Sequence, residues 1–187
     1  MKKLLVLSCI LAVFSTAFSQ NQDHKLTRKE QREIKKQEDE AMRKALAEVL
    51  VVSIDTKQWV LEANTLVNKY GNSVQVSSTI NFVAIEGEEA FIQLGSNSGL
   101  GANGVGGVSV RGNITSYKAD HNEKKGTYYI IVMVSSPVGS YDIRINCSED
   151  GTMATATIQG LGPNRVTYRG NLLPIEKSNV YKGTPVF

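Results

Sequence analysis

The chain has 187 residues, of which 41% are hydrophobic and 21% are charged, and its formal net charge is +3 at pH 7. This length is sufficient for one domain with its own hydrophobic core. A nucleic-acid partner would require a strong basic bias, and the small net charge therefore leads us to expect no such partner.

Residues 1–19 have the three-part pattern of a secretory signal peptide. A positive start, Lys2-Lys3, precedes an apolar run over residues 4–14, and the small residues Ala17 and Ser19 stand where a signal peptidase cleaves. This apolar run is too short for a membrane span, which needs about 20 residues. We therefore expect an exported protein without a transmembrane segment, either periplasmic or associated with the outer membrane.

The two cysteines have different predicted fates. A lipid anchor at Cys9 is disfavoured, because only residues 4–8 would precede it as apolar core. Cleavage of the leader removes Cys9 and leaves Cys147, which cannot form an intramolecular disulfide alone. Alternation along the chain places Cys147 on the same strand face as Ile143 and Ile145, and this predicts a buried side chain. A nucleophile or an intermolecular disulfide is the alternative.

Residues 20–52 are predicted to form a charged helical lead-in. Thr27 and Glu30 have the spacing of a capping box at the start of a helix. Apolar residues recur at positions 42, 45, 46, 49 and 50, which lie on one stripe of an amphipathic helix. Only the second half of the helix is therefore expected to pack on a core. The alternative is that residues 27–50 associate with other chains in a structural envelope protein.

Residues 53–187 are predicted to form a single β-rich domain, because polar and apolar residues alternate with a period of two. The expected strands cover residues 59–64 with 74–76, 79–85, 90–94, 108–117, 127–134, 142–147, 153–159 and 165–173. About seven to eight strands without intervening helices predict an antiparallel β-sandwich or a partly open barrel. The segment 127–134 is the most hydrophobic and is expected to be buried on both faces. The tail from residue 177 onward is expected to be extended or loose.

A glycine-rich passage over residues 95–107 contains the spelling G-x-G-x-x-G. Dinucleotide binding requires a helix directly after such glycines, whereas a strand is expected from Val108. We therefore expect no cofactor. Long loops are uncommon unless they bind a ligand or are disordered, so this loop is the expected ligand-facing surface. Its candidate residues are Gly95, Asn97, Gly99, Gly101, Asn103 and Gly104.

The sequence predicts no catalytic residue and no metal site. His24 is expected to lie in the disordered start of the mature chain, before Thr27, and His121 is expected to be a solvated loop residue beside a turn. Carboxylates are scattered over the turns and form no recognisable acid/base pair, although a pair assembled from distant strands remains an alternative. The strand tyrosines are expected to be core and cross-strand partners, with a binding face as the alternative; they are Tyr128, Tyr129, Tyr141 and Tyr168.

Four segments resemble a known family: Trp59–Ala63, Gly106–Gly112, Lys125–Val132 and Arg165–Gly170. The chain is similar to small exported Bacteroidetes proteins known only as domain of unknown function 4251, from Trp59 to about Glu176. The Leu-Pro-Tyr-like element expected after the second hairpin strand is replaced here by a stretch without Pro or Tyr. The resemblance implies an exported β-rich domain, and it implies no activity, cofactor or site residue.

These observations predict an exported β-rich domain that acts as a non-enzymatic periplasmic or surface binding module. Its ligand would be a protein or a small molecule. One alternative is a hydrolase or carbohydrate-active enzyme with a site assembled across strands. The other is the structural envelope protein.

Overall fold

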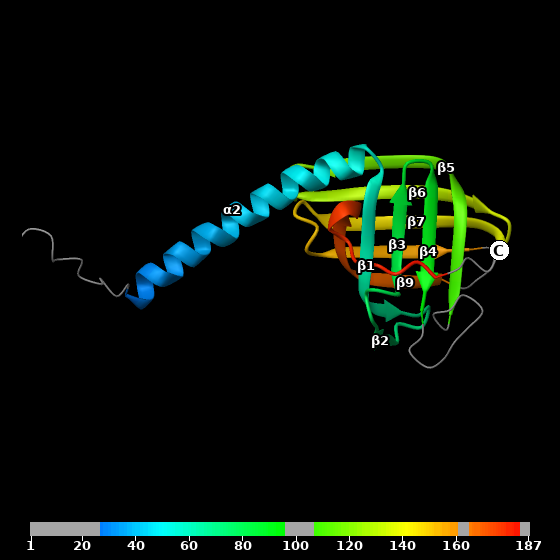
Figure 1. Ribbon diagram of the computed structural model, residues 1–187, viewed down its shortest axis with the longest axis horizontal. Coiled ribbons are helices and arrows are strands. Elements are labelled where there is room, and N and C mark those ends of the chain that lie inside the picture. The colour runs from blue at the N-terminus through cyan, green and yellow to red at the C-terminus, as the bar shows by residue number, and fades with distance from the viewer. Residues whose placement is uncertain (1–26, 96–106, 161–164, 184–187) are drawn as a thin grey trace, which may run out of the picture. The chain divides into compact units, whose positions relative to one another are not determined.

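The computed structural model describes residues 27–95, 107–160 and 165–183 (Figure 1). The chain divides into two compact units, residues 1–39 and 40–187. Helix α2 (Arg28–Asp55) contributes to both units, and all the strands belong to the second. None of the helices in these described ranges has the length and apolar character that a membrane-spanning helix needs.

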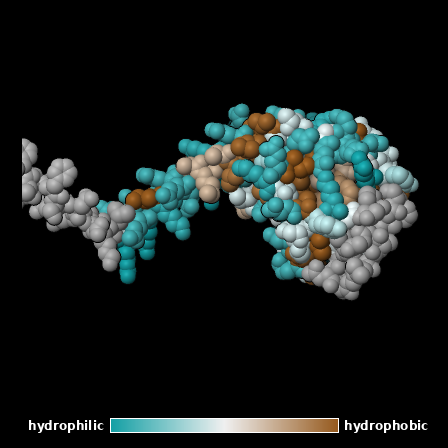
Figure 2. All heavy atoms as spheres, viewed as in Figure 1, coloured by the Kyte–Doolittle hydropathy of each residue, from teal (hydrophilic) through white to brown (hydrophobic). Residues whose placement is uncertain are grey.

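The predicted capping box begins α2. The Glu30 N–H donates to Thr27 Oγ1 at 3.3 Å, and the Thr27 N–H donates to Glu30 Oε2 at 2.7 Å. This backbone hydrogen bond favours the carboxylate and lowers the pKa of Glu30. The side chains of residues 28–39 are exposed, and Figure 2 colours this part of the helix mostly hydrophilic.

The last two turns of α2 pack against the β-rich core of the second unit. Leu50 and Ile54 are each 1% exposed and belong to the main core cluster. The helix ends where Lys57 adopts the left-handed region with a φ of 56°, and the Lys57 N–H donates to the Ile54 carbonyl at 3.2 Å. A left-handed residue at this position is a common helix terminator.

The described residues contain nine strands, and each strand pairs antiparallel with its neighbours. The strands are β1 (Gln58–Val67), β2 (Ser73–Gln75), β3 (Phe82–Glu86), β4 (Glu89–Leu94), β5 (Val108–Asn122), β6 (Thr127–Ser136), β7 (Gly139–Ser148), β8 (Ala154–Gln159) and β9 (Arg165–Pro174). Pairing of β1 with β9 closes eight of them into a barrel, and β2 is an extra strand on β1. The predicted fold class is confirmed, and the barrel is closed.

Large apolar side chains fill the inside of the barrel. They alternate along each strand with outward-facing residues, as a period of two requires. Fully buried members of this core include Trp59, Leu61, Ile130, Ile143 and Tyr168, each no more than 1% exposed. Leu50 and Ile54 of α2 join the same cluster.

The prediction that residues 127–134 are buried on both faces is wrong. In β6, buried Tyr128, Ile130, Val132 and Val134 alternate with more exposed residues, and Met133 is 47% exposed. Among the described residues, no other element covers the outer side of this strand. The hydrophobic character of the segment was therefore not evidence for burial on both faces.

Double-sided burial occurs instead in β1, β3 and β4. In β3, four consecutive residues, Phe82–Ile85, are buried. The outward-facing Val60, Phe82, Ala84 and Phe91 form a second cluster, separate from the barrel interior, against which Ile175 and Val180 pack. Figure 1 shows the red C-terminal segment crossing the front of β1, β3 and β4. We call residues 175–183, which begin with the short helix η1 (Ile175–Lys177), the C-terminal strap.

Candidate functional site

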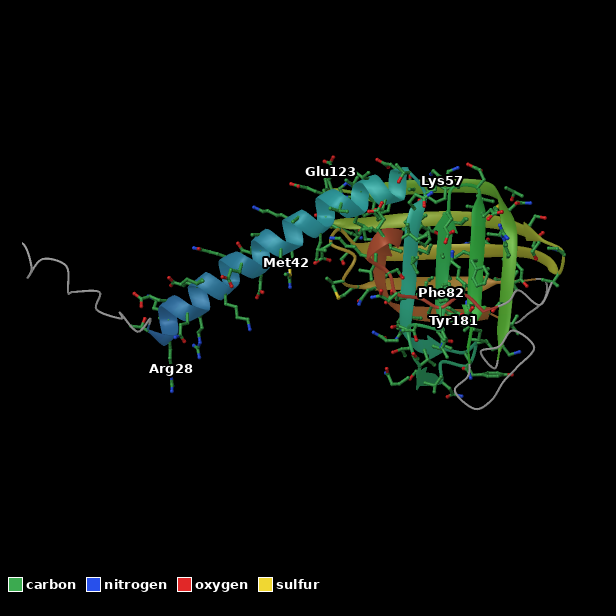
Figure 3. The ribbon with its side chains drawn as sticks, in the orientation of Figure 1. Arg28, Met42, Lys57, Phe82, Glu123 and Tyr181 are labelled. Carbon is green, nitrogen blue, oxygen red and sulfur yellow. The ribbon has the colours of Figure 1, made fainter. Side chains whose placement is uncertain are left out.

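The C-terminal strap is bound to the outer face of the barrel. The expectation of an extended or loose tail is corrected only in part, because residues 178–183 have no regular secondary structure but are not loose. The Ser178 hydroxyl donates to Glu62 Oε1 at 2.6 Å. The Tyr181 N–H donates to the Thr79 carbonyl at 2.8 Å. Figure 3 labels Tyr181 on the strap and Phe82 on β3, and Phe82 belongs to the covered outer cluster.

Gln93 of β4 is the main polar anchor of the strap, and it is 0% exposed. Its Nε2 donates to the Tyr181 carbonyl at 2.8 Å and to the Ile80 carbonyl at 3.2 Å. Its Oε1 accepts from the Gly183 N–H at 2.8 Å and from the Ser109 hydroxyl at 3.1 Å. A buried amide is stable only when its donors and acceptors are bonded, and the strap supplies two of these four partners.

A groove of about 420 Å³ lies beside the strap, on the outside of β3, β4 and β5. We call it the strap groove, and its lining residues are Ala84, Glu86, Glu89, Ala90, Phe91, Arg111, Lys182 and Gly183. This volume is within the range of small-ligand sites. Alanines and the largely buried Phe91 give the groove apolar surface, and the four charged residues surround it.

The charged residues of the strap groove form two ion pairs. Arg111 Nη2 donates to Glu89 Oε1 at 2.8 Å and Oε2 at 2.6 Å, and Arg111 Nε donates to Oε2 at 3.2 Å. The Lys182 ammonium pairs with Glu86 and lies 6.0 Å from the centroid of the Phe91 ring. The Phe91 ring stacks on Phe82 with a centroid separation of 5.8 Å, which fixes its orientation.

Glu86 and Glu89 are directly opposite each other in the register of β3 and β4. Like charges in facing positions, with Cβ atoms about 4.5–5.5 Å apart, are unfavourable in a sheet. The strap cation and the β5 guanidinium offset this repulsion. The groove therefore concentrates negative charge at the β3–β4 end and depends on cations brought from two other segments.

The predicted glycine-loop site lies almost entirely outside the described residues, including Asn97, Gly99, Gly101, Asn103 and Gly104. Gly95 is described, and its N–H donates to Asn81 Oδ1 at 3.0 Å. A Cβ atom at Gly95 would lie 2.7 Å from the Ile80 carbonyl oxygen, so close packing explains this glycine. The strand β5 begins at Val108, as predicted.

His121 lies within β5 and not in a loop, and it is exposed beside the turn over residues 123–126, as predicted. Its Nε2 is 2.7 Å from Glu149 Oε1, and its ring stacks on Tyr128 with centroids 4.4 Å apart. Asp120 pairs instead with Lys118 at 2.8 Å. In the part of the chain that the structure describes, no three His, Cys, Asp or Glu side chains are grouped as a metal site requires. His24 is outside that part.

Cys147 and two tyrosines belong to the core. Cys147 is buried on the same face of β7 as Ile143 and Ile145, and burial raises the pKa of its thiol to about 12. A thiol with this pKa is a poor nucleophile at neutral pH. Tyr168 is buried, and its hydroxyl donates to the Gln93 carbonyl at 2.9 Å. Tyr128 is also buried, whereas Tyr129 and Tyr141 are half-buried.

Sequence reasoning did not identify the strap groove. The sequence indicated only that Glu86 and Glu89 lie in a turn, and Arg111 and Lys182 are far from them in the sequence. Strand pairing brings Arg111 beside β4, and the strap brings Lys182 across from the C-terminal end. The only available signal was the continuous apolar character of residues 82–85, which is typical of a strand covered on both faces.

Comparisons with known proteins connect this fold to one family. The family model "Domain of unknown function (DUF4251)" matches residues 41–172. A crystal structure of a DUF4251 family protein from Bacteroides eggerthii is similar, with 28% sequence identity and a TM-score of 0.61. The similarity covers 72% of this chain and 91% of that chain. None of the curated proteins compared with the chain matches it. The chain belongs to the DUF4251 family.

Proposed function

We propose that this protein is an exported, non-enzymatic binding module whose ligand occupies the strap groove. The observation that carries this proposal is the groove itself, in which an aromatic floor is surrounded by charges from β3, β4, β5 and the strap. Binding sites typically combine apolar surface with a few placed polar groups. The leader pattern of residues 1–19 supports export to the periplasm or the outer membrane.

The packed barrel interior favours an external site. Trp59, Tyr168 and Leu172 are among the side chains that fill the inside, each no more than 1% exposed. Barrels that hold a ligand internally keep space for it. The strap groove, in contrast, is open to solvent on the outside of β3, β4 and β5.

Facing carboxylates favour one alternative, a hydrolase. Glu86 and Glu89 stand opposite each other, and retaining glycosidases place two carboxyl groups about 5–5.5 Å apart. Both carboxylates already bind a cationic side chain, however, so neither is arranged to donate a proton to a leaving group. We therefore rank binding first. Release of nitrophenol from nitrophenyl glycosides, abolished by Glu89→Gln, would reverse this order.

Titration of the isotope-labelled protein followed by NMR tests the binding proposal. The probes are L-lysine, L-glutamate, glucose and N-acetylglucosamine, each added to about 10 mM so that millimolar affinities are visible. At least one probe should shift the amide resonances of β3, β4 and β5 around the groove. Shifts spread evenly over the barrel, or no shifts with any probe, would contradict the proposal.

A matched pair of variants sharpens this test. Arg111→Gln should weaken binding of the active probe about tenfold, which corresponds to about 1.4 kcal/mol. Arg144→Gln is the control, because Arg144 is equally exposed (59% against 58%) and also pairs with a carboxylate, but it lies on β7, outside the groove. Equal effects of the two variants would indicate nonspecific charge binding.

A further inference from the structure

Part of the strap is recognised through its main chain. Within residues 181–183, the N–H and carbonyl of Tyr181 and the N–H of Gly183 all bond to the barrel. Their partners are the Thr79 carbonyl and the Gln93 amide. The Gln93 side chain bonds to Tyr181 and Gly183, which are two residues apart. A neighbouring strand would bond to an extended segment at the same spacing.

Two strap side chains beside Tyr181 contact the barrel face with specific chemistry. Val180 packs on the outer apolar cluster that includes Phe82 and Phe91. Lys182 pairs with Glu86 and lies over the Phe91 ring. Tyr181 between them is 63% exposed. The face therefore selects an apolar residue, a free position and then a cation, all in an extended chain.

The acidic end of the groove supports this preference for a cation. Glu86 and Glu89 repel each other across the strands, so this position favours any cation that can reach it. Lys182 reaches it from the strap, which is noncovalently held and lies on the protein's outer surface. A basic residue on another polypeptide would satisfy the same carboxylate.

We propose that the outer face of β1, β3 and β4 is a docking surface for an extended segment of a partner protein with the pattern apolar–any–Lys, and that the strap occupies this surface as an internal competitor. This inference goes beyond the proposed function, because the partner segment would take the place of the strap, whereas the ligand of the proposed function occupies the groove beside the strap. A tethered strap acts at an effective concentration near the millimolar range, so a partner must displace it.

A fluorescent peptide with the sequence of residues 175–183, blocked at both ends, tests the proposal by fluorescence anisotropy. The full chain carrying Val180→Asp should bind it at least tenfold more tightly than the wild type does. That substitution weakens the tethered strap and leaves the barrel face unchanged. Val138→Asp, at an exposed apolar position in the turn between β6 and β7, is the control and should behave as the wild type.

Exchanging the charges of the peptide lysine and of Glu86 distinguishes specific recognition from nonspecific binding. A peptide with Glu in place of its second lysine, the one corresponding to Lys182, should bind the Val180→Asp chain at least tenfold more weakly. Adding Glu86→Lys to Val180→Asp should reverse the preference between the two peptides. Equal binding of both peptides by both chains would overturn the proposal.

Two further readouts complete the test. Circular dichroism and the amide spectrum of the barrel should be unchanged in Val180→Asp; if they are altered, Lys182→Ala replaces it with the same expectations. A dimer formed without peptide would assign the face to strap exchange between two copies and would overturn the proposal. If the small probes shift the groove resonances but the peptide does not bind, this inference alone is rejected. If the small probes cause no shifts and the peptide does not bind, the proposed function is rejected as well.

Discussion

Replacing Gln93 with leucine is expected to release the strap and destabilise the barrel. Leucine has a similar size and cannot form any of the four hydrogen bonds of the buried amide. Two of these bonds hold Tyr181 and Gly183 of the strap, and one holds the Ile80 carbonyl in the turn before β3. The fourth comes from the Ser109 hydroxyl.

The magnitude follows from the net value of a hydrogen bond, about 0.5–1.5 kcal/mol each. Four bonds give an upper range of about 2–6 kcal/mol. The strap can detach, so water restores the hydrogen bonding of Tyr181 and Gly183 at the cost of exposing the apolar cluster beneath. We therefore expect Gln93→Leu to lower the free energy of unfolding by about 2–4 kcal/mol.

Urea unfolding measured by tryptophan fluorescence provides the assay, because Trp59 is the only tryptophan and is fully buried. Hydrogen exchange should show the amides of Tyr181 and Gly183 exchanging much faster in the variant than in the wild type. Gln75→Leu is the control, since Gln75 is exposed on β2, and it should change stability by no more than about 0.5 kcal/mol. If the free energy of unfolding falls by less than about 1 kcal/mol, and hydrogen exchange at Tyr181 and Gly183 is unchanged, this account of the Gln93 anchor is refuted.

Three other outcomes are expected. Tyr117→Phe should cost about 1–3 kcal/mol in urea unfolding, because the Tyr117 hydroxyl accepts from Trp59 Nε1 at 3.1 Å and donates to the Ile54 carbonyl at 2.8 Å. Burial raises the pKa of both Tyr117 and Cys147 to about 12, so stability should be intact below about pH 9 and fall as the pH rises towards 12, as measured by unfolding at constant temperature. Gly170→Ala should prevent closure of the barrel, because the new Cβ would lie 1.8 Å from a backbone oxygen of β1; a folded variant with native hydrogen exchange at β1 and β9 would disprove this.

Local patterns were sufficient to predict most of the helix and strand positions. Alternation indicated the strands and placed Cys147 on the buried face with Ile143 and Ile145. The Thr27–Glu30 spacing predicted the start of α2. These features depend on neighbouring residues, so they are visible without knowledge of the fold. Strand ends were less accurate: β3 begins at Phe82 and not at residue 79, and β5 continues to Asn122.

The sequence by itself determined which residues share a strand face, because a period of two is a local property of an extended chain. Only the tertiary structure decided which faces are covered. Pairing of β1 with β9 closed the barrel, and the strap buried the outside of β3 while β6 stayed open to solvent. Glu86, Arg111 and Lys182 meet at one groove for the same reason, since long-range pairing and packing set these contacts and no local pattern encodes them.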